Sequence, residues 1–221
     1  MGIKVGLFFI ISLFINFYSY ASSPDYYLNQ WYLYGGALND TEVGGIGYDK
    51  YLLEGIDESN EVVTVILSSG IDVNHEDLSG SMWVNENEIP SNGIDDDNNG
   101  YIDDIHGINP SLLNGDLIDE YGFGTDMAGV IAGTKNNIGI NGLSSNNKII
   151  GCKVSPDVYT RDYIKCIDYI IGLKNQLNLN IASVVYDWTS TGLKIGQLDH
   201  NVLYATQLTH NAIKKLEAND I

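Results

Sequence analysis

An acidic loop holds the first residues whose types and spacing suggest chemistry. Five carboxylates fall between residues 95 and 104, and they would repel one another unless a cation lay among them. The loop follows the pattern D-x-D-x-N-G-x-x-D, which alternates oxygen ligands, places Gly at a sharp turn and adds a backbone carbonyl. The pattern predicts a calcium site with the ligands Asp95, Asp97, Asn99 and Asp103, and Tyr101 through its backbone carbonyl.

The ligand set of this loop is incomplete. His106 occupies the twelfth position, where an EF-hand loop carries a bidentate Glu. Either Asp104 or a carboxylate remote in the sequence would therefore have to complete the site. The alternative is a solvated acidic loop that binds no ion.

The composition favours a folded, acidic protein. The chain has 221 residues, of which 44% are hydrophobic, so it can bury a core. It carries 11 Lys and Arg against 29 Asp and Glu, a formal net charge of −18. Such a surface repels nucleic acid and anionic membranes, and we expect neither as a partner.

The N-terminus is typical of a secretory signal peptide. Lys4 precedes an apolar run from Val5 to Tyr18, and Ser19 and Ala21 suit a cleavage site after Ala21. The alternative, a membrane anchor, is less favoured because a spanning helix needs roughly 18 or more apolar residues. We therefore expect a signal peptide over 1–21 and a secreted or secretory-pathway protein with no membrane segment after cleavage.

Export changes the interpretation of the two cysteines. Cys152 and Cys166 are the only cysteines in the chain, and an exported protein can keep a disulfide. We expect them to be bonded; the alternative is two buried free thiols.

Strand and helix patterns alternate after an extended lead-in over 22–60. Val62–Leu67 is a continuous β-branched run, typical of a buried parallel strand. Strands alternating with helices predict a parallel α/β sheet. The further expected elements are a helix over Gly124–Gly133, a strand over Ile149–Val154, a helix over about 160–174, a strand over Ile181–Tyr186 and a helix over Leu198–Glu217.

Four motifs follow one another along the chain, with a strand after them: Val65–Leu78, the acidic stretch Trp83–Asp104, Asp119–Gly129, Asn136–Gly142 and the strand Lys148–Val154. In this order they resemble the motifs of the subtilisin family of serine proteases. The resemblance implies a three-layer α/β subtilisin-like fold with a parallel sheet. It also implies that 61–221 is a partial peptidase domain that lacks the C-terminal half.

The departures from the family pattern concern catalysis. Ser68 stands where the family has the catalytic Asp, and Phe123 where it has the catalytic His. A hydroxyl cannot stabilise an imidazolium as a carboxylate does, and a phenyl ring exchanges no proton. The motif Gly-Thr-Ser-Met-Ala and the oxyanion Asn would lie beyond Ile221. These departures predict no catalytic residues, and hence a proteolytically inactive homologue that is not an enzyme.

The resemblance also implies binding residues. The family's substrate-pairing edge corresponds to Tyr186, Asp187 and Trp188. A second calcium would be held by the side chains of Asp77 and Asn136 and the carbonyls of Thr134, Ile138 and Ile140.

Three functions stay open. The first is an inactive homologue that binds or regulates a protein or peptide partner. The second is part of a subtilisin-like serine endopeptidase whose C-terminal half lies elsewhere. The third is a calcium-stabilised fragment without a function of its own.

Overall fold

The computed structural model describes residues 30, 33, 46, 48, 60–154, 160–186 and 210–221. The expected signal peptide over 1–21, most of the lead-in, and two of the expected substrate-binding residues, Asp187 and Trp188, lie outside these residues.

None of the helices within the described residues is both long and apolar enough to cross a bilayer.

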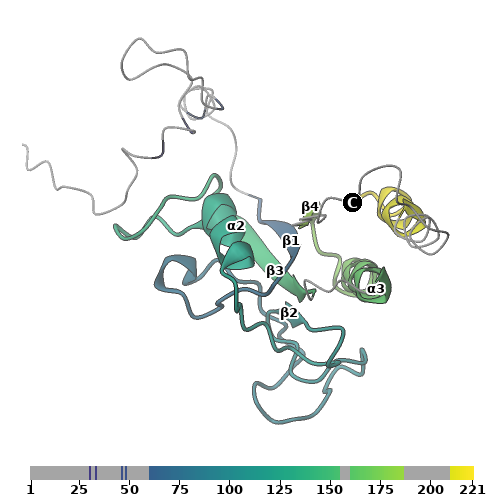
Figure 1. The fold of residues 1–221 in the computed structure, drawn as a ribbon. Helices are drawn as coiled ribbons and strands as arrows, with labels where there is room; N and C mark the ends of the chain where they lie inside the picture. Colours follow the sequence, from purple (N-terminus) through teal and green to yellow (C-terminus); the bar gives the residue numbers. More distant parts are fainter. Residues whose placement is uncertain are drawn as a thin grey trace, which may run out of the picture.

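A parallel sheet forms the centre of the described fold (Figure 1). Its strands are β1 (Val62–Ser68), β2 (Gly107–Ile108), β3 (Asn147–Lys153) and β4 (Ile181–Tyr186), in the order β2-β3-β1-β4. Every pairing is parallel. β1 lies between β3 and β4, which explains why six of its seven residues are buried and why its sequence is apolar throughout.

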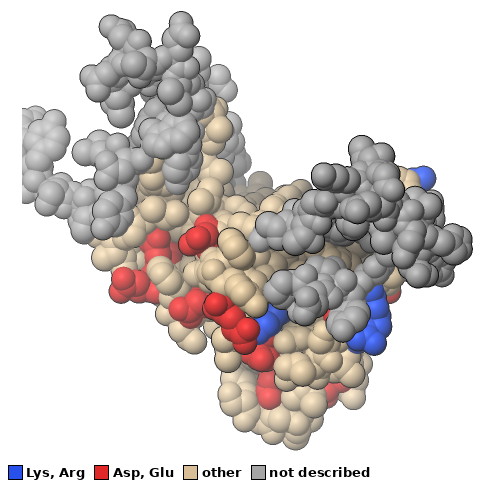
Figure 2. All heavy atoms as spheres, viewed as in Figure 1, with Lys and Arg blue, Asp and Glu red and all other residues tan. Residues whose placement is uncertain are grey.

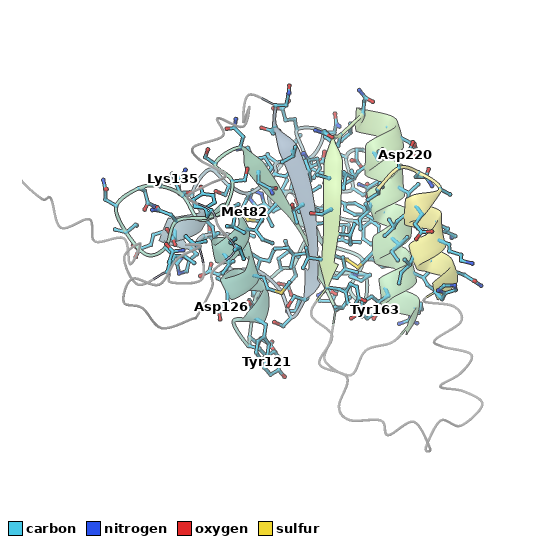
Figure 3. All side chains as sticks on the ribbon, turned by 90° about the horizontal axis from the view of Figure 1, so that it is seen from above. Met82, Tyr121, Asp126, Lys135, Tyr163 and Asp220 are labelled. Carbon is cyan, nitrogen blue, oxygen red and sulfur yellow. A yellow bond between two sulfur atoms is a disulfide. The ribbon has the colours of Figure 1, made fainter. Side chains whose placement is uncertain are left out.

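Helices cover both faces of the sheet (Figures 1 and 3). α2 (Phe123–Ala132) lies on one face, and α3 (Thr160–Leu177) lies on the other with the helical residues 210–217. Side chains of β1 alternate between the two layers, as a strand requires. Val65 and Leu67 belong to the cluster that includes Ile170 of α3, whereas Ile66 packs in the cluster with Ala128 of α2.

The expected strands and helices are confirmed where the structure describes them. The boundaries differ by up to three residues, as in α3, which ends at Leu177. Of the helix expected over 198–217, only 210–217 lies within the described part. Two short elements were not expected, β2 and the 3₁₀ helix η3 (Glu76–Leu78).

The expected disulfide is present. Cys152 of β3 and Cys166 of α3 are bonded with their Cα atoms 6.1 Å apart, and both are buried. The bond fixes α3 against the sheet at β3.

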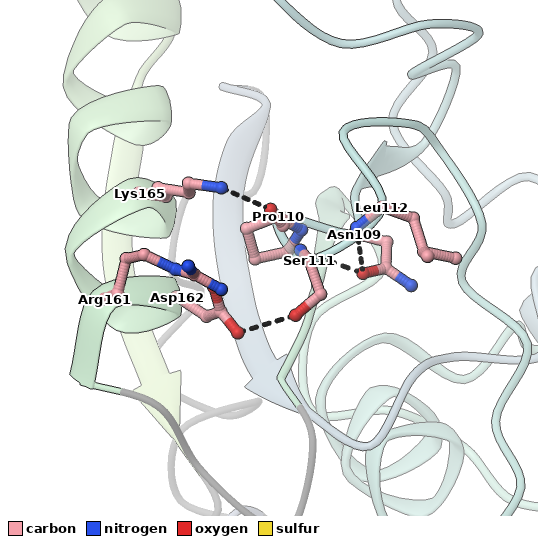
Figure 4. Close-up of polar contacts among 7 residues, drawn as sticks. All are labelled: Asn109, Pro110, Ser111, Leu112, Arg161, Asp162 and Lys165. Carbon is pink, nitrogen blue, oxygen red and sulfur yellow. Dashed lines mark hydrogen bonds and ion pairs between the residues drawn. The ribbon is translucent and has the colours of Figure 1, made fainter.

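Polar contacts tie α3 to the loop that follows β2 (Figure 4). Ser111 Oγ donates to Asp162 Oδ2 at 2.6 Å, and Lys165 Nζ donates to the Pro110 carbonyl at 2.6 Å. Asp162 is almost fully buried in the first turn of α3, where the helix dipole favours a negative charge. These contacts hold the loop over 109–112 in place beside the helix.

Candidate active site and metal centre

The end of β1 and the start of α2 meet at the carboxyl edge of the sheet. Ser68 is the last residue of β1, and Phe123 is the first of α2. A Cβ atom on Gly124 would lie 1.9 Å from the Gly70 carbonyl oxygen and 3.1 Å from Ser68 Cβ. The helix can therefore start directly against the strand end only because residue 124 is a glycine. The structure thus brings together the two positions that sequence reasoning singled out.

The two side chains at this junction differ in exposure. Ser68 is 2% exposed, and its Oγ has no hydrogen-bond partner among the described residues. Phe123 is 50% exposed and stacks on Tyr121, with the ring centroids 6.4 Å apart. Tyr186, at the end of β4, pairs in register with Leu67 and is 51% exposed, so it lies at the same sheet edge.

Asp119 organises the segment that enters α2. Its carboxylate accepts hydrogen bonds from Ser69 Oγ at 2.6 Å, Thr125 Oγ1 at 2.7 Å, and the backbone N–H groups of Thr125 and Gly122 at 2.9 Å each. Burial would raise the pKa of Asp119, but the hydrogen bonds from Ser69, Thr125 and Gly122 outweigh it and lower the pKa below its ordinary value. The N-cap residue Gly122 has no side chain to cap α2, and Asp119 serves the orphan N–H groups instead. Sequence reasoning missed this role, although an Asp just before a helix start is a recognisable signal.

Two described histidines are engaged outside this junction. His75 Nδ1 accepts a hydrogen bond from the Asp77 backbone N–H at 3.1 Å. His106 Nδ1 lies 2.6 Å from the Trp83 carbonyl oxygen.

Three carboxylates converge in the acidic loop. One oxygen each from Glu88, Asp95 and Asp97 lie within 4.8 Å of one another. Glu88 is 5% exposed, and its Oε1 accepts the backbone N–H groups of Asp96 and Asp97 at 2.8 and 3.0 Å. Carboxylate oxygens are the ligands that hard cations prefer, so this donor set fits calcium. Glu88 is remote from the loop motif in the sequence, and it had not been identified as a candidate ligand from the sequence.

The other predicted loop ligands make different contacts. Asp103 accepts the backbone N–H groups of Asn92 and Gly93, each at 3.0 Å. The ring of Tyr101 packs edge-on against Tyr169, with centroids 5.4 Å apart. The Asp103 carboxylate is thus not part of the convergent group, whereas the contribution expected from Tyr101 is its backbone carbonyl.

Asp104 links the acidic loop to α3. It is fully buried and accepts hydrogen bonds from Tyr169 Oη at 2.7 Å and Asn99 Nδ2 at 2.9 Å. Burial raises the pKa of Asp104 from 3.8 to about 6, the hydrogen bonds from Tyr169 and Asn99 oppose the shift, and the charges of Asp97 and Glu88 add to it. The loop therefore concentrates negative charge both at its surface and against the core.

The residues implied for a second calcium also come together. Asp77 Oδ2 accepts the Ile140 N–H at 2.9 Å, and the Asp77 carbonyl accepts the Thr134 N–H at 2.8 Å. Asn136 Oδ1 accepts the Ile138 N–H at 3.0 Å. Hydrogen bonds thus hold the segment over 134–140 against Asp77.

Gln30 joins this segment from the lead-in and was missed from the sequence. Its side chain is 2% exposed and bonds both backbone groups of Asn141, at 3.0 and 2.9 Å. A contact across 111 residues leaves no local pattern.

Known proteins with similar sequences are proteases of one family. The model of the subtilase family matches residues 59–199, more than half of the chain. Subtilisin-like protease 1 of Plasmodium berghei (strain Anka) is 38% identical over 150 residues, covering 62% of this chain and 25% of the relative. Its namesakes in Plasmodium falciparum (isolate 3D7) and Plasmodium vivax are 36% and 40% identical, covering 54% and 48% of this chain and 19% and 18% of each relative.

These relatives contradict the prediction that the chain is not an enzyme. They are named as proteases, and nothing in the matches indicates inactivity. The chain spans a quarter or less of the length of the curated relatives that it matches. A motif absent from such a stretch is not thereby absent from the protein, and two replaced side chains were too narrow a basis for that prediction.

The parallel sheet with helices on both faces, the close junction of strand and helix, and the family match over 59–199 agree, and the chain belongs to the subtilase family.

Proposed function

We propose that the protein acts as a slow subtilisin-like serine endopeptidase to which this chain contributes the first part of the catalytic domain. The observation that carries the proposal is the junction of β1 and α2, where Gly124 brings Phe123 next to the end of the strand that bears Ser68. Family membership and the names of the relatives support it.

The slow rate follows from the side chains at this junction. Peptide cleavage by this family's chemistry needs a nucleophile, a base that takes its proton and a group that orients the base. Ser68 and Phe123 supply neither the base nor a carboxylate. The nucleophile and the proton acceptor therefore come from other residues of the complete protein, and loss of the ordinary pair costs about 10⁴- to 10⁶-fold in turnover.

Restoring the two side chains tests this proposal. In the complete protein, the double variant Ser68→Asp, Phe123→His should raise kcat on a mixed peptide library by at least about 10³-fold, because it restores an oriented base. The matched control is Val130→His, which puts an imidazole at an exposed position near the other end of α2 and should leave kcat unchanged. Undetectable cleavage by both the natural protein and the double variant would contradict the proposal.

We also propose that calcium binds the convergent carboxylates of Glu88, Asp95 and Asp97. The support is the 4.8 Å grouping of their oxygens and the buried position of Glu88. Among the described contacts, these three carboxylates accept hydrogen bonds only from neutral N–H groups. A bound cation would offset the repulsion between their negative charges.

Calcium should therefore raise the melting temperature of the protein, since a ligand at 100 times its Kd stabilises the native state by about 2.7 kcal/mol. Asp97→Asn should remove most of that gain, whereas Asp126→Asn, a matched exposed change on α2, should keep it. Differential scanning calorimetry with and without chelator gives the measurement. Equal calcium-dependent gains in both variants would exclude this site.

We propose finally that the protein is secreted after removal of residues 1–21. The charged start, apolar run and small residues at the expected cleavage site support this. Sequencing the N-terminus of the exported protein should give Ser22 as the first residue, and a protein that retains Met1 would contradict the cleavage.

A further inference from the structure

A cleft of about 660 Å³ opens beside the junction of β1 and α2. Its walls are the residues 71–74 after β1, parts of the acidic loop and the residues 115–119 before α2. Asp119 belongs both to this wall and to the junction, because it accepts the hydrogen bond from Ser69, the neighbour of Ser68. A peptide held at the junction would therefore lie next to the cleft.

Carboxylates predominate among the charged side chains of the cleft wall. One histidine, His106, also lines it, and its Nδ1 lies 2.6 Å from the Trp83 carbonyl oxygen. The wall includes Asp72, Asp103, Asp116 and Asp119, and no Lys or Arg is among its lining residues. Their described hydrogen-bond donors are neutral; Asp72 Oδ1, for example, accepts the backbone N–H of Asn74 at 3.1 Å.

Among the described residues, none of these four carboxylates forms an ion pair with a Lys or Arg side chain. Asp116 likewise has a neutral donor: among the described contacts, its Oδ1 accepts only the Ile118 N–H, at 3.2 Å. Lys153 contacts the same region, but its Nζ donates to the Ile118 carbonyl and it is not part of the wall. Figure 2 shows several acidic side chains, with basic side chains beside some of them, on the face that it displays.

Three exposed apolar side chains, called the apolar rim below, belong to residues 118–123. Ile118 lines the cleft, whereas Tyr121 and Phe123 follow the lining residue Asp119, which accepts the Tyr121 N–H at 3.3 Å. Ile118, Tyr121 and Phe123 are 67%, 58% and 50% exposed. The stacked rings of Tyr121 and Phe123 have an interplanar angle of 12°, and Figure 3 shows Tyr121 at the end of α2 that meets the strand ends. Large side chains held in the open are typical of contact surfaces, and aromatic faces also attract cations.

We propose that this cleft binds a Lys or Arg side chain of a peptide substrate, with the apolar rim packing on the alkyl stem. The charged head would meet Asp72 and Asp116, while the methylene stem would cover Ile118 and the aromatic pair. Lys and Arg are the peptide side chains that combine an apolar stem with a positive head, and that pairing matches the wall and its rim. This inference adds a substrate class to the proposed function. It rests on that function, because a bound peptide is a substrate only if the protein is an endopeptidase.

Peptide binding tests the proposal without any need for cleavage. Fluorescence anisotropy of the full chain, in excess calcium and low salt, would compare labelled peptides that differ only in one central Arg, Gln or Glu. We expect the Arg peptide to bind about tenfold more tightly than the Gln peptide, an advantage that falls at high salt because exposed charges are screened. Equal affinities for the Arg and Gln peptides would overturn the proposal.

Two double variants place the effect in the cleft. Asp72→Asn with Asp116→Asn should abolish the Arg preference, whereas Asp126→Asn with Glu217→Gln removes the same charge from exposed positions outside the wall and should keep it. Loss of the preference in both would show a general charge effect and overturn the proposal. Melting curves check that each variant is folded.

The outcome is separable from that of the proposed function. An Arg preference without any peptide cleavage would refute the endopeptidase proposal but support binding of a basic side chain in the cleft. Cleavage without an Arg preference would support the endopeptidase proposal and refute binding of a basic side chain in the cleft. Displacement of the Arg peptide by additional calcium would mean that the carboxylates hold an ion, and would also overturn the proposal.

Discussion

The contact between the start of α2 and the end of β1 is the constraint on which the rest of this site depends. A glycine at residue 124 lets a helix backbone lie against the Gly70 carbonyl, where any Cβ atom would overlap it at 1.9 Å. This close contact positions the start of α2 at the carboxyl edge of the sheet, together with the residues on either side of it. Asp119 closes the N-terminal turn of the helix, Phe123 stands beside the strand end, and the acidic cleft opens next to both.

In the acidic loop the dominant interaction is the repulsion between neighbouring carboxylates. Glu88 reaches the loop through two backbone N–H groups and brings a third carboxylate to Asp95 and Asp97. Asp104, just behind them, is buried against Tyr169. The calcium proposed above would offset the repulsion among these carboxylates. The Cys152–Cys166 bond and the contacts of Asp162 fix the helix against which the loop packs.

The sheet and helices could be predicted because their signals are local. The run over Val62–Leu67 and the helical spacing around Ile167 report burial directly, and the structure confirms both. β2 has two residues and no period, so nothing in the sequence distinguishes it from a loop. Glu88 and Gln30 were missed because their roles arise from contacts with residues distant along the chain. The activity was misjudged for a different reason, since the side chains at two positions are too little evidence to decide whether a protein is an enzyme.

The most direct test of the account is the stability of Gly124→Ala beside Gly129→Ala, two changes in the same helix. An added Cβ at Gly129 would have Ile140 Cδ1 as its nearest neighbour, at 3.4 Å, whereas at Gly124 it would meet backbone at 1.9 Å. Urea unfolding should show that Gly124→Ala lowers the free energy of unfolding by about 3 kcal/mol. Gly129→Ala should leave it unchanged or raise it by roughly 0.5 kcal/mol through helix propensity. Equal stabilities for the two variants would contradict the account, because the junction that positions the site would then not depend on the close contact at Gly124.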